Sequence, residues 1–251
     1  VWQLGVFLRL RPAVGSNGLP PPNTIRVICT TLFFSPLLLL MADFFDDGRP
    51  HDGLSYDEYR TDWKRRLEES PPDGADPSER RMHYYLRYNW DRQAHVHQAY
   101  QPSEELQSVV EAVDSPQLWM TLTEPWCGDS AFLLPVVAEA ASLSEDVTLR
   151  ILPRDDNLDI MDQYLTGGSR SIPKLVVFST DGDELFTWGP RPEGAAQRYQ
   201  TLKQKHDDKQ QLIAELLEYY DDGGWREVDD ELAASLRSVV EPPAVSEGEV
   251  Q

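Results

Sequence analysis

Cysteine is scarce in this chain of 251 residues, because only Cys29 and Cys127 occur. Two thiols so far apart do not form the framework of disulfides that stabilises small secreted domains. Basic side chains are also few: 23 lysines and arginines face 43 aspartates and glutamates, which leaves a net charge of −20. Nucleic-acid binding requires a basic surface to neutralise phosphates, so this composition argues against nucleic acid and against anionic membranes as partners.

Acidic residues are absent from residues 1–40, whereas about a fifth of the remaining chain is Asp or Glu. The apolar run from Val27 to Met41 is interrupted by Pro36 and is shorter than the roughly 20 residues that span a bilayer. No small-residue cleavage pattern of a secretory signal follows it. We therefore expect residues 1–40 to be an untranslated upstream region or an unstructured leader. Translation from Met41 leaves 211 residues with a charge of −23, and we expect this protein in the cytoplasm.

Hydrophobic periodicity after residue 41 predicts helices first and a sheet later. Apolar residues recur every three to four positions in three helical segments, 55–70, 79–100 and 103–113. A continuous β-rich run at 117–123 predicts a strand buried on both faces, and further strands are predicted at 147–153 and 174–180. The Asp181-Gly182 turn adds a fourth strand as a hairpin. Further helical segments are predicted at 130–144, 157–165 and 192–220, with a short one from Asp229.

The order of these elements predicts an α/β fold. A helix joins the first two strands and makes them parallel, and the hairpin adds antiparallel strands. The expected architecture is a central mixed sheet of about four strands flanked by helices. Residues 41–114 are expected to form a helical N-terminal extension, 115–240 the sheet domain with its C-terminal helices, and 241–251 a disordered acidic tail.

The stretch "TEPWCGDSAFLLP" places Cys127 at the start of a helix, directly after a buried strand. Trp126-Cys127-Gly128, Pro135 eight residues after the cysteine, Ile172-Pro173 before the third strand and Gly189 after the fourth resemble the marks of the thioredoxin fold over residues 115–190. Over 55–220 the chain is similar to a group of bacterial thioredoxin-family proteins that have a helical N-terminal extension and WCGD in place of WCGPC. The resemblance implies a thioredoxin fold and a thiol role, and it supplies no substrate.

The residues around Cys127 indicate how a thiol would work there. A helix N-terminus favours the thiolate, so we expect a lowered pKa for Cys127. Gly128 leaves room for the backbone of a partner to approach, and Trp126 is placed to shield and orient the thiol. The resemblance implies a cis bond between Ile172 and Pro173, which presents the neighbouring backbone to an extended peptide or a thiol ligand.

Three positions depart from the thioredoxin pattern. Ser130 stands where thioredoxins have the resolving cysteine, so no disulfide can form within the motif, although its hydroxyl is placed to hydrogen-bond a thiolate. Asp129 favours the helix start, but its negative charge opposes thiolate formation beside it. Thr121 replaces the buried carboxylate that thioredoxins use as a proton acceptor. Resolution of a mixed disulfide then needs an external thiol.

Three functions remain open on these residues. The first is monothiol exchange through Cys127, with protein thiols or disulfides and a low-molecular-weight thiol as partners. The second is a redox-inactive binding module that holds an extended protein segment in a groove beside Pro173. The third follows from the likeness of CGDS to the CGFS of monothiol glutaredoxins, which bind an iron–sulfur cluster with glutathione; the replacement of Phe by Asp129 weakens it.

Other chemistry-bearing groups are interpreted as structural. His95 and His97 do not face each other on a helix, so we expect no metal site and no cofactor. Gly167-Gly168 is a turn, since no GK[ST] follows it. The aromatic group Tyr84, Tyr85, Tyr88 and Trp90, like Met82, is expected to pack between the added helices and the sheet domain.

Overall fold

The computed structural model describes residues 43–69, 71 and 74–240. All of them belong to one compact unit, which spans Leu39–Gln251. The predictions for 1–40 and for 241–251 fall outside the described residues. None of the helices in the described part combines the length and the apolar character that a bilayer span requires.

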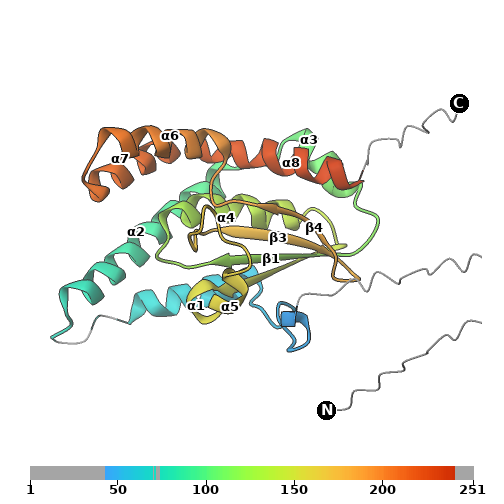
Figure 1. Ribbon diagram of the computed structural model, residues 1–251, viewed down its shortest axis with the longest axis horizontal. Coiled ribbons are helices and arrows are strands. Elements are labelled where there is room, and N and C mark those ends of the chain that lie inside the picture. The colour runs from blue at the N-terminus through green and yellow to red at the C-terminus, as the bar shows by residue number, and fades with distance from the viewer. Residues whose placement is uncertain (1–42, 70, 72–73, 241–251) are drawn as a thin grey trace, which may run out of the picture. The chain divides into compact units, whose positions relative to one another are not determined.

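A mixed four-stranded sheet lies at the centre of this unit (Figure 1). Its strands are β1 (Gln117–Thr123), β2 (Val147–Pro153), β3 (Lys174–Ser179) and β4 (Glu184–Trp188). They lie in the order β2-β1-β3-β4, with β1 parallel to β2 and antiparallel to β3. All seven residues of β1 are buried, because both faces of the central strands are covered. The predicted α/β fold with a sheet of about four strands is confirmed.

Each face of the sheet carries its own apolar cluster, as the alternation of side chains along a strand requires. On one face, Trp119 and Val177 pack with α4 (Gly128–Ala141) and α8 (Glu227–Val240). On the other face, Met120 and Phe178 pack with α5 (Leu158–Met161) and with Phe44 of the short helix η1 (Asp43–Phe45). Cys127 belongs to this second cluster.

Three helices precede β1, and two of them begin at capping boxes. Ser55 caps α1 (Tyr56–Glu68) together with Glu58, and Asp76 caps α2 (Pro77–Ala99) together with Glu79. The cap at Asp76 starts α2 two residues before the predicted position. Helix α2 packs on α4, and α3 (Glu104–Glu111) packs on α8, so the helices before the sheet and those after it share one core.

The C-terminal helices differ from the prediction. The segment 192–220 contains two helices, α6 (Glu193–Lys205) and α7 (Lys209–Asp221), because the side chain of Asp208 accepts from the Gln210 amide and caps a new start. A 3₁₀ turn, η3 (Gly224–Arg226), then leads into α8, which starts before Asp229 and has 14 residues. Segment 157–165 is also shorter than predicted: the 3₁₀ turn η2 (Arg154–Asp156) precedes α5, which has four residues.

The aromatic group on α2 packs only in part, which corrects the prediction for this helix. Trp90 lies edge-on against Trp63 with 5.5 Å between ring centroids. Tyr84, Tyr85 and Tyr88 are instead 53%, 40% and 45% exposed, and Met82 is exposed as well. Helix α2 buries the side that carries Leu86, Asn89, Gln93 and Val96, and Tyr84 and Tyr88 point away from that side. Met82 and Tyr85 lie nearer to it, but they belong to the part of α2 before Leu86, in which no residue is buried.

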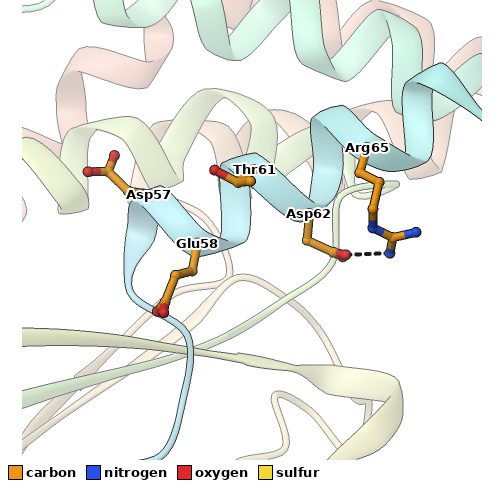
Figure 2. A pocket seen from close by; sticks show the side chains of 5 residues that line it. All are labelled: Asp57, Glu58, Thr61, Asp62 and Arg65. Carbon is orange, nitrogen blue, oxygen red and sulfur yellow. Dashed lines mark hydrogen bonds and ion pairs between the residues drawn. The ribbon is translucent and has the colours of Figure 1, made fainter.

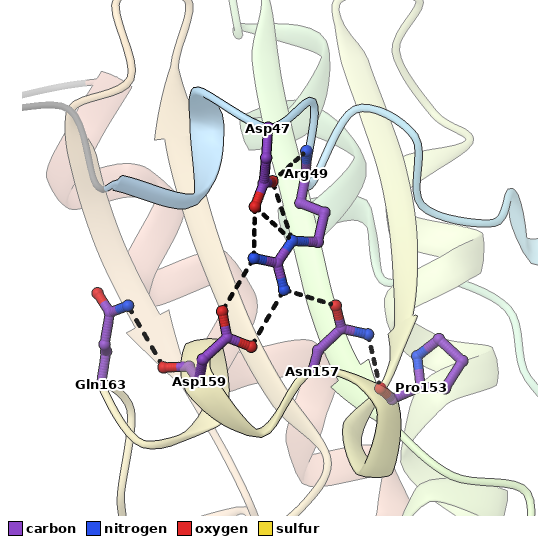
Figure 3. A network of polar contacts seen from close by, with 6 residues as sticks. All are labelled: Asp47, Arg49, Pro153, Asn157, Asp159 and Gln163. Atoms are coloured by element: carbon purple, nitrogen blue, oxygen red, sulfur yellow. Dashed lines mark hydrogen bonds and ion pairs between the residues drawn. The ribbon is translucent and has the colours of Figure 1, made fainter.

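A polar network fixes the segment before α1 to the end of β2 (Figure 3). The guanidinium of Arg49 donates to Asp47 at 2.6 Å, to Asp159 at 2.9 Å and to Asn157 at 3.2 Å. Asn157 in turn donates to the carbonyl of Pro153 at 2.8 Å. The network therefore holds the segment of Phe44 beside α5, on the face of the sheet that carries Cys127.

Candidate functional site

Cys127 is the N-cap residue of α4 and the last of the four residues that connect β1 to this helix. Its side chain is only 8% exposed. The thiol donates a hydrogen bond to the carbonyl of Ile172 at 3.4 Å, and the Ile172–Pro173 peptide bond is cis. The structure thus brings together Cys127 and the Ile172-Pro173 pair, 45 residues apart in the sequence.

The pKa of Cys127 is raised to about 11, and the largest cause is burial of the thiol. The negative charge of Asp129 adds to the rise, while Ser130 and Arg191 oppose it. A helix N-terminus stabilises a thiolate only modestly, and loss of water around the sulfur outweighs it here. The prediction of a lowered pKa for this thiol is therefore wrong.

Asp129 is buried and forms a bidentate ion pair with Arg191. Arg191 Nε donates to Oδ1 at 2.9 Å and Nη2 to Oδ2 at 2.6 Å. Tyr220 Oη of α7 donates to the same carboxylate at 2.9 Å, and the Arg191 guanidinium lies 4.3 Å from the ring centroid of Tyr199 on α6. Burial raises the pKa of Asp129, and the contacts with Arg191 and Tyr220 counteract this rise. The first turn of α4 is thus tied to α6 and α7.

Arg191 and Tyr220 are site residues that the sequence reasoning missed. Asp129 in the first turn of an otherwise apolar helix is a signal that such partners exist, because a buried carboxylate needs a cation or several hydrogen-bond donors. The partners lie 62 and 91 residues downstream, so no local pattern points to them.

Helix α7 also covers Gly128. A Cβ atom on Gly128 would lie 2.9 Å from Cδ2 of Leu217. The close approach that this glycine permits is therefore used by the chain's own α7, whereas the sequence suggested the backbone of a partner.

Four hydroxyls, on α1, β1 and the first turn of α4, are buried without hydrogen bonds. Ser130 Oγ, Thr121 Oγ1, Thr123 Oγ1 and Tyr59 Oη have no hydrogen-bond partner among the described residues. Ser130 stands close enough to affect the pKa of Cys127, but no hydrogen bond of good geometry joins its hydroxyl to the sulfur. Thr121 is buried at the position that thioredoxins give to a carboxylate.

Trp126 is half-buried at the junction of two apolar clusters. The guanidinium of Arg154 lies 4.8 Å from its ring centroid and donates to the carbonyl of Arg170. A cation at this distance is attracted to the indole face. Trp126 thus shields one side of the Cys127 region and is itself covered by Arg154.

A hollow of about 350 Å³ lies on the surface of α1, away from these residues (Figure 2). It is lined by Asp57, Glu58, Thr61, Asp62 and Arg65, with Arg65 paired to Asp62 at 2.5 Å. No residue that the sequence predicts for the site lines it.

Within the described ranges, no group of three or more His, Cys, Asp and Glu side chains is placed to hold a metal ion. His97 is hydrogen-bonded to Tyr56 Oη at 2.7 Å.

A cysteine between a strand and a helix, beside a cis proline at one face of this mixed sheet, is the arrangement of a thioredoxin-type protein. A family model described as Thioredoxin matches residues 76–204, which is more than half of the chain. The chain belongs to this thioredoxin family. No curated protein matches the chain.

Two solved structures are similar to this chain. One is the crystal structure of a protein of unknown function from Pseudomonas aeruginosa, at 16% identity and a TM-score of 0.45; the match covers 74% of this chain and 98% of that one. The other is a crystal structure of an HIV epitope-scaffold, at 17% identity and a TM-score of 0.46; it covers 74% of this chain and 99% of that one.

Proposed function

We propose that this chain is a thioredoxin-fold binding module in which Cys127 is a buried structural thiol. The observation that carries the proposal is the covered sulfur, whose pKa is raised to about 11. At neutral pH a thiol with that pKa is ionised on the order of once in ten thousand molecules, against a few per cent for an unperturbed cysteine. Since the thiolate is the nucleophile, exchange through the resting conformation is slow.

The parts that complete a dithiol cycle are also replaced. Ser130 cannot resolve a mixed disulfide, and Thr121 cannot accept a proton as a carboxylate does. Ile172 and Pro173 are buried, and the Ile172 carbonyl already accepts from the Cys127 thiol. An extended segment beside Pro173 would have to displace that contact, which favours a docking surface elsewhere on the module.

Monothiol exchange is the second candidate, and the position of Cys127 opposite the cis Ile172–Pro173 bond favours it. In that reaction the Cys127 thiolate attacks one sulfur of a partner's disulfide and releases the other as a thiolate. A low-molecular-weight thiol then attacks the mixed disulfide and releases Cys127. Both steps require the residues that bury the sulfur, Ile172 among them, to move away from it.

Alkylation separates the two candidates. Iodoacetamide is added to a Cys29→Ser variant, in which Cys127 is the remaining thiol, over a range of pH in the native state and in urea. For a structural thiol we expect native alkylation to be at least about 100-fold slower than in urea at neutral pH, in line with the thiolate fraction. Cys127→Ser in the same background gives the blank.

Monothiol exchange would be supported if the rate of alkylation in the native state rises with pH around a pKa below 8. A mixed disulfide with glutathione at Cys127, formed from glutathione disulfide and preserved by acid quenching, would support it equally. Either result would overturn the structural-thiol proposal. Failure of native alkylation alongside normal reaction in urea would support it.

A further inference from the structure

The exposed side of α2 carries a row of five residues, Arg81, Tyr84, Tyr85, Tyr88 and Asp91, which we name the α2 stripe. Their spacing of three to four residues places them along one side of the helix. All five are exposed in the structure. Exposed tyrosines that lie singly are ordinary, but three adjacent ones on one side indicate an interaction surface.

The tyrosines of the stripe are held in place before any partner arrives. The rings of Tyr84 and Tyr88 lie 4.2 Å apart between centroids, and the Arg92 guanidinium lies 5.8 Å from the Tyr88 centroid. Aromatic side chains that are already ordered lose little conformational entropy on binding. Tyr and Arg are also the residue types that contribute most to binding energy in protein interfaces.

Charge favours another copy of the chain as the occupant. The whole chain has a net charge of −20, so two copies repel each other over most of their surfaces. Helix α2 is an exception, because it contains four arginines and only two acidic residues. Two copies that meet through α2 therefore approach through a part of the surface that does not add to the repulsion.

The order of charges along the stripe is self-complementary. Arg81 stands at its N-terminal end and Asp91 at its C-terminal end, with the tyrosines between them. No ion pair involves Arg81 among the described residues, and Asp91 has one distant contact with Arg87, at 3.9 Å with both side chains 68% exposed. A twofold axis applies the same pairing twice.

We propose that the α2 stripe is a self-association surface on which the α2 helices of two copies lie antiparallel about a twofold axis. Arg81 of each copy faces Asp91 of the other, and Tyr84 faces Tyr88 of the other. A parallel arrangement would set like charges against each other at both ends. The inference goes beyond the proposed function and holds whether or not Cys127 reacts.

Sedimentation equilibrium on the full chain, from micromolar to millimolar concentration, tests the proposal. We expect a monomer–dimer equilibrium for the unchanged chain. Arg81→Asp and Asp91→Arg each set like charges together twice, so each raises the dissociation constant by about tenfold or more. The double variant Arg81→Asp/Asp91→Arg restores opposite charges at both contacts and returns the dissociation constant toward that of the unchanged chain.

The variants distinguish pairing from net charge. Arg81→Asp makes the chain more acidic and Asp91→Arg makes it less acidic, yet both are expected to weaken the dimer. Arg198→Asp on α6 is the matched control, because it removes an exposed arginine elsewhere and should leave the dimer intact. Far-UV circular dichroism checks that every variant keeps its helices.

Three results would overturn the inference. The first is a monomer throughout the concentration range. The second is a dimer that either single variant leaves unchanged, and the third is a double variant that remains as weak as the singles. Cys127→Ser should leave the association unaltered, so failure here is separable from any result at the thiol.

Discussion

Replacing Asp129 by Ala tests how strongly the buried ion pair holds the C-terminal helices to α4. The side chains of Arg191 and Asp129 are only 17% and 10% exposed, and two hydrogen bonds join them. Removing the carboxylate leaves a buried guanidinium without its counter-ion and Tyr220 without its acceptor. Breaking a buried pair in this way costs about 3–5 kcal/mol of folding free energy.

Asp162→Ala provides a control with the same chemistry at the surface. Arg170 donates to Asp162 through the same two nitrogens, at 2.6 Å and 2.7 Å, but these side chains are 45% and 47% exposed. An exposed pair is worth about 0–1 kcal/mol. Urea unfolding followed by circular dichroism gives both free energies, provided that the m-value is unchanged.

Equal losses in the two variants would refute the reasoning, because burial would then not set the value of the pair. The double variant Asp129→Ala/Arg191→Met checks the cause of the loss. It removes the stranded charge and fills its place with an apolar chain, so it should recover much of the lost stability. A double variant no more stable than Asp129→Ala would show that an unpaired Arg191 is not the source of the cost.

Two further predictions concern the same region. Because burial raises the pKa of Cys127 from 9.0 to about 11, the unfolded chain releases this proton first. The contribution of the protonated thiol to the free energy of unfolding is complete below about pH 9 and falls by about 2–3 kcal/mol as the pH rises to about 11. Urea unfolding over this pH range should therefore show a loss of stability in the unchanged chain that Cys127→Ala does not show. Gly189→Ala should cost about 3 kcal/mol or more, since Gly189 has a φ of +102° and a Cβ there would lie 2.3 Å from the Pro173 carbonyl oxygen. Gly128→Ala should cost about 1 kcal/mol or less, because only the end of the Leu217 side chain has to move; a reversed order in thermal unfolding would contradict this.

The central strand β1 was predictable because a strand buried on both faces has a continuous apolar sequence, whereas β2 is exposed in part and was predicted from its β-forming residues. Strands β1 and β2 occupy the predicted residues, 117–123 and 147–153. The C-terminal helices were less predictable from the sequence, because no glycine or proline marks the break between α6 and α7. The start of α7 depends on one cap, Asp208, within a run of charged residues that fits a continuous helix equally well.

At the site, the sequence predicted that Cys127 lies beside Pro173, but it predicted neither the partners of Asp129 nor the protonation state of the thiol. Cys127 and Pro173 could be placed together because both mark known positions of one fold. The pKa of Cys127 depends on burial among residues distant in the sequence, such as Ile172, 45 residues downstream, and a helix N-terminus considered in isolation predicts the opposite direction. Long-range cover of this kind leaves no trace in local spacing.

Asp129 acts on Cys127 in two ways that point in the same direction. Its charge raises the pKa of the thiol, and its contacts with Arg191 and Tyr220 hold α7 against the first turn of α4, which directly follows Cys127. Leu217 lies one turn before Tyr220 on α7, so lifting Leu217 from Gly128 also strains the Tyr220–Asp129 hydrogen bond. If opening has to break the buried network at a cost of about 3 kcal/mol, fewer than about one molecule in 100 is open at any moment. A partner that moves α7 away from α4 therefore has to compete for Arg191 or Tyr220. Because the charge of Asp129 raises the pKa of Cys127 whereas Ser130 lowers it, a substitution that removes this charge should increase the reactivity of the thiol, and a substitution at Ser130 should not.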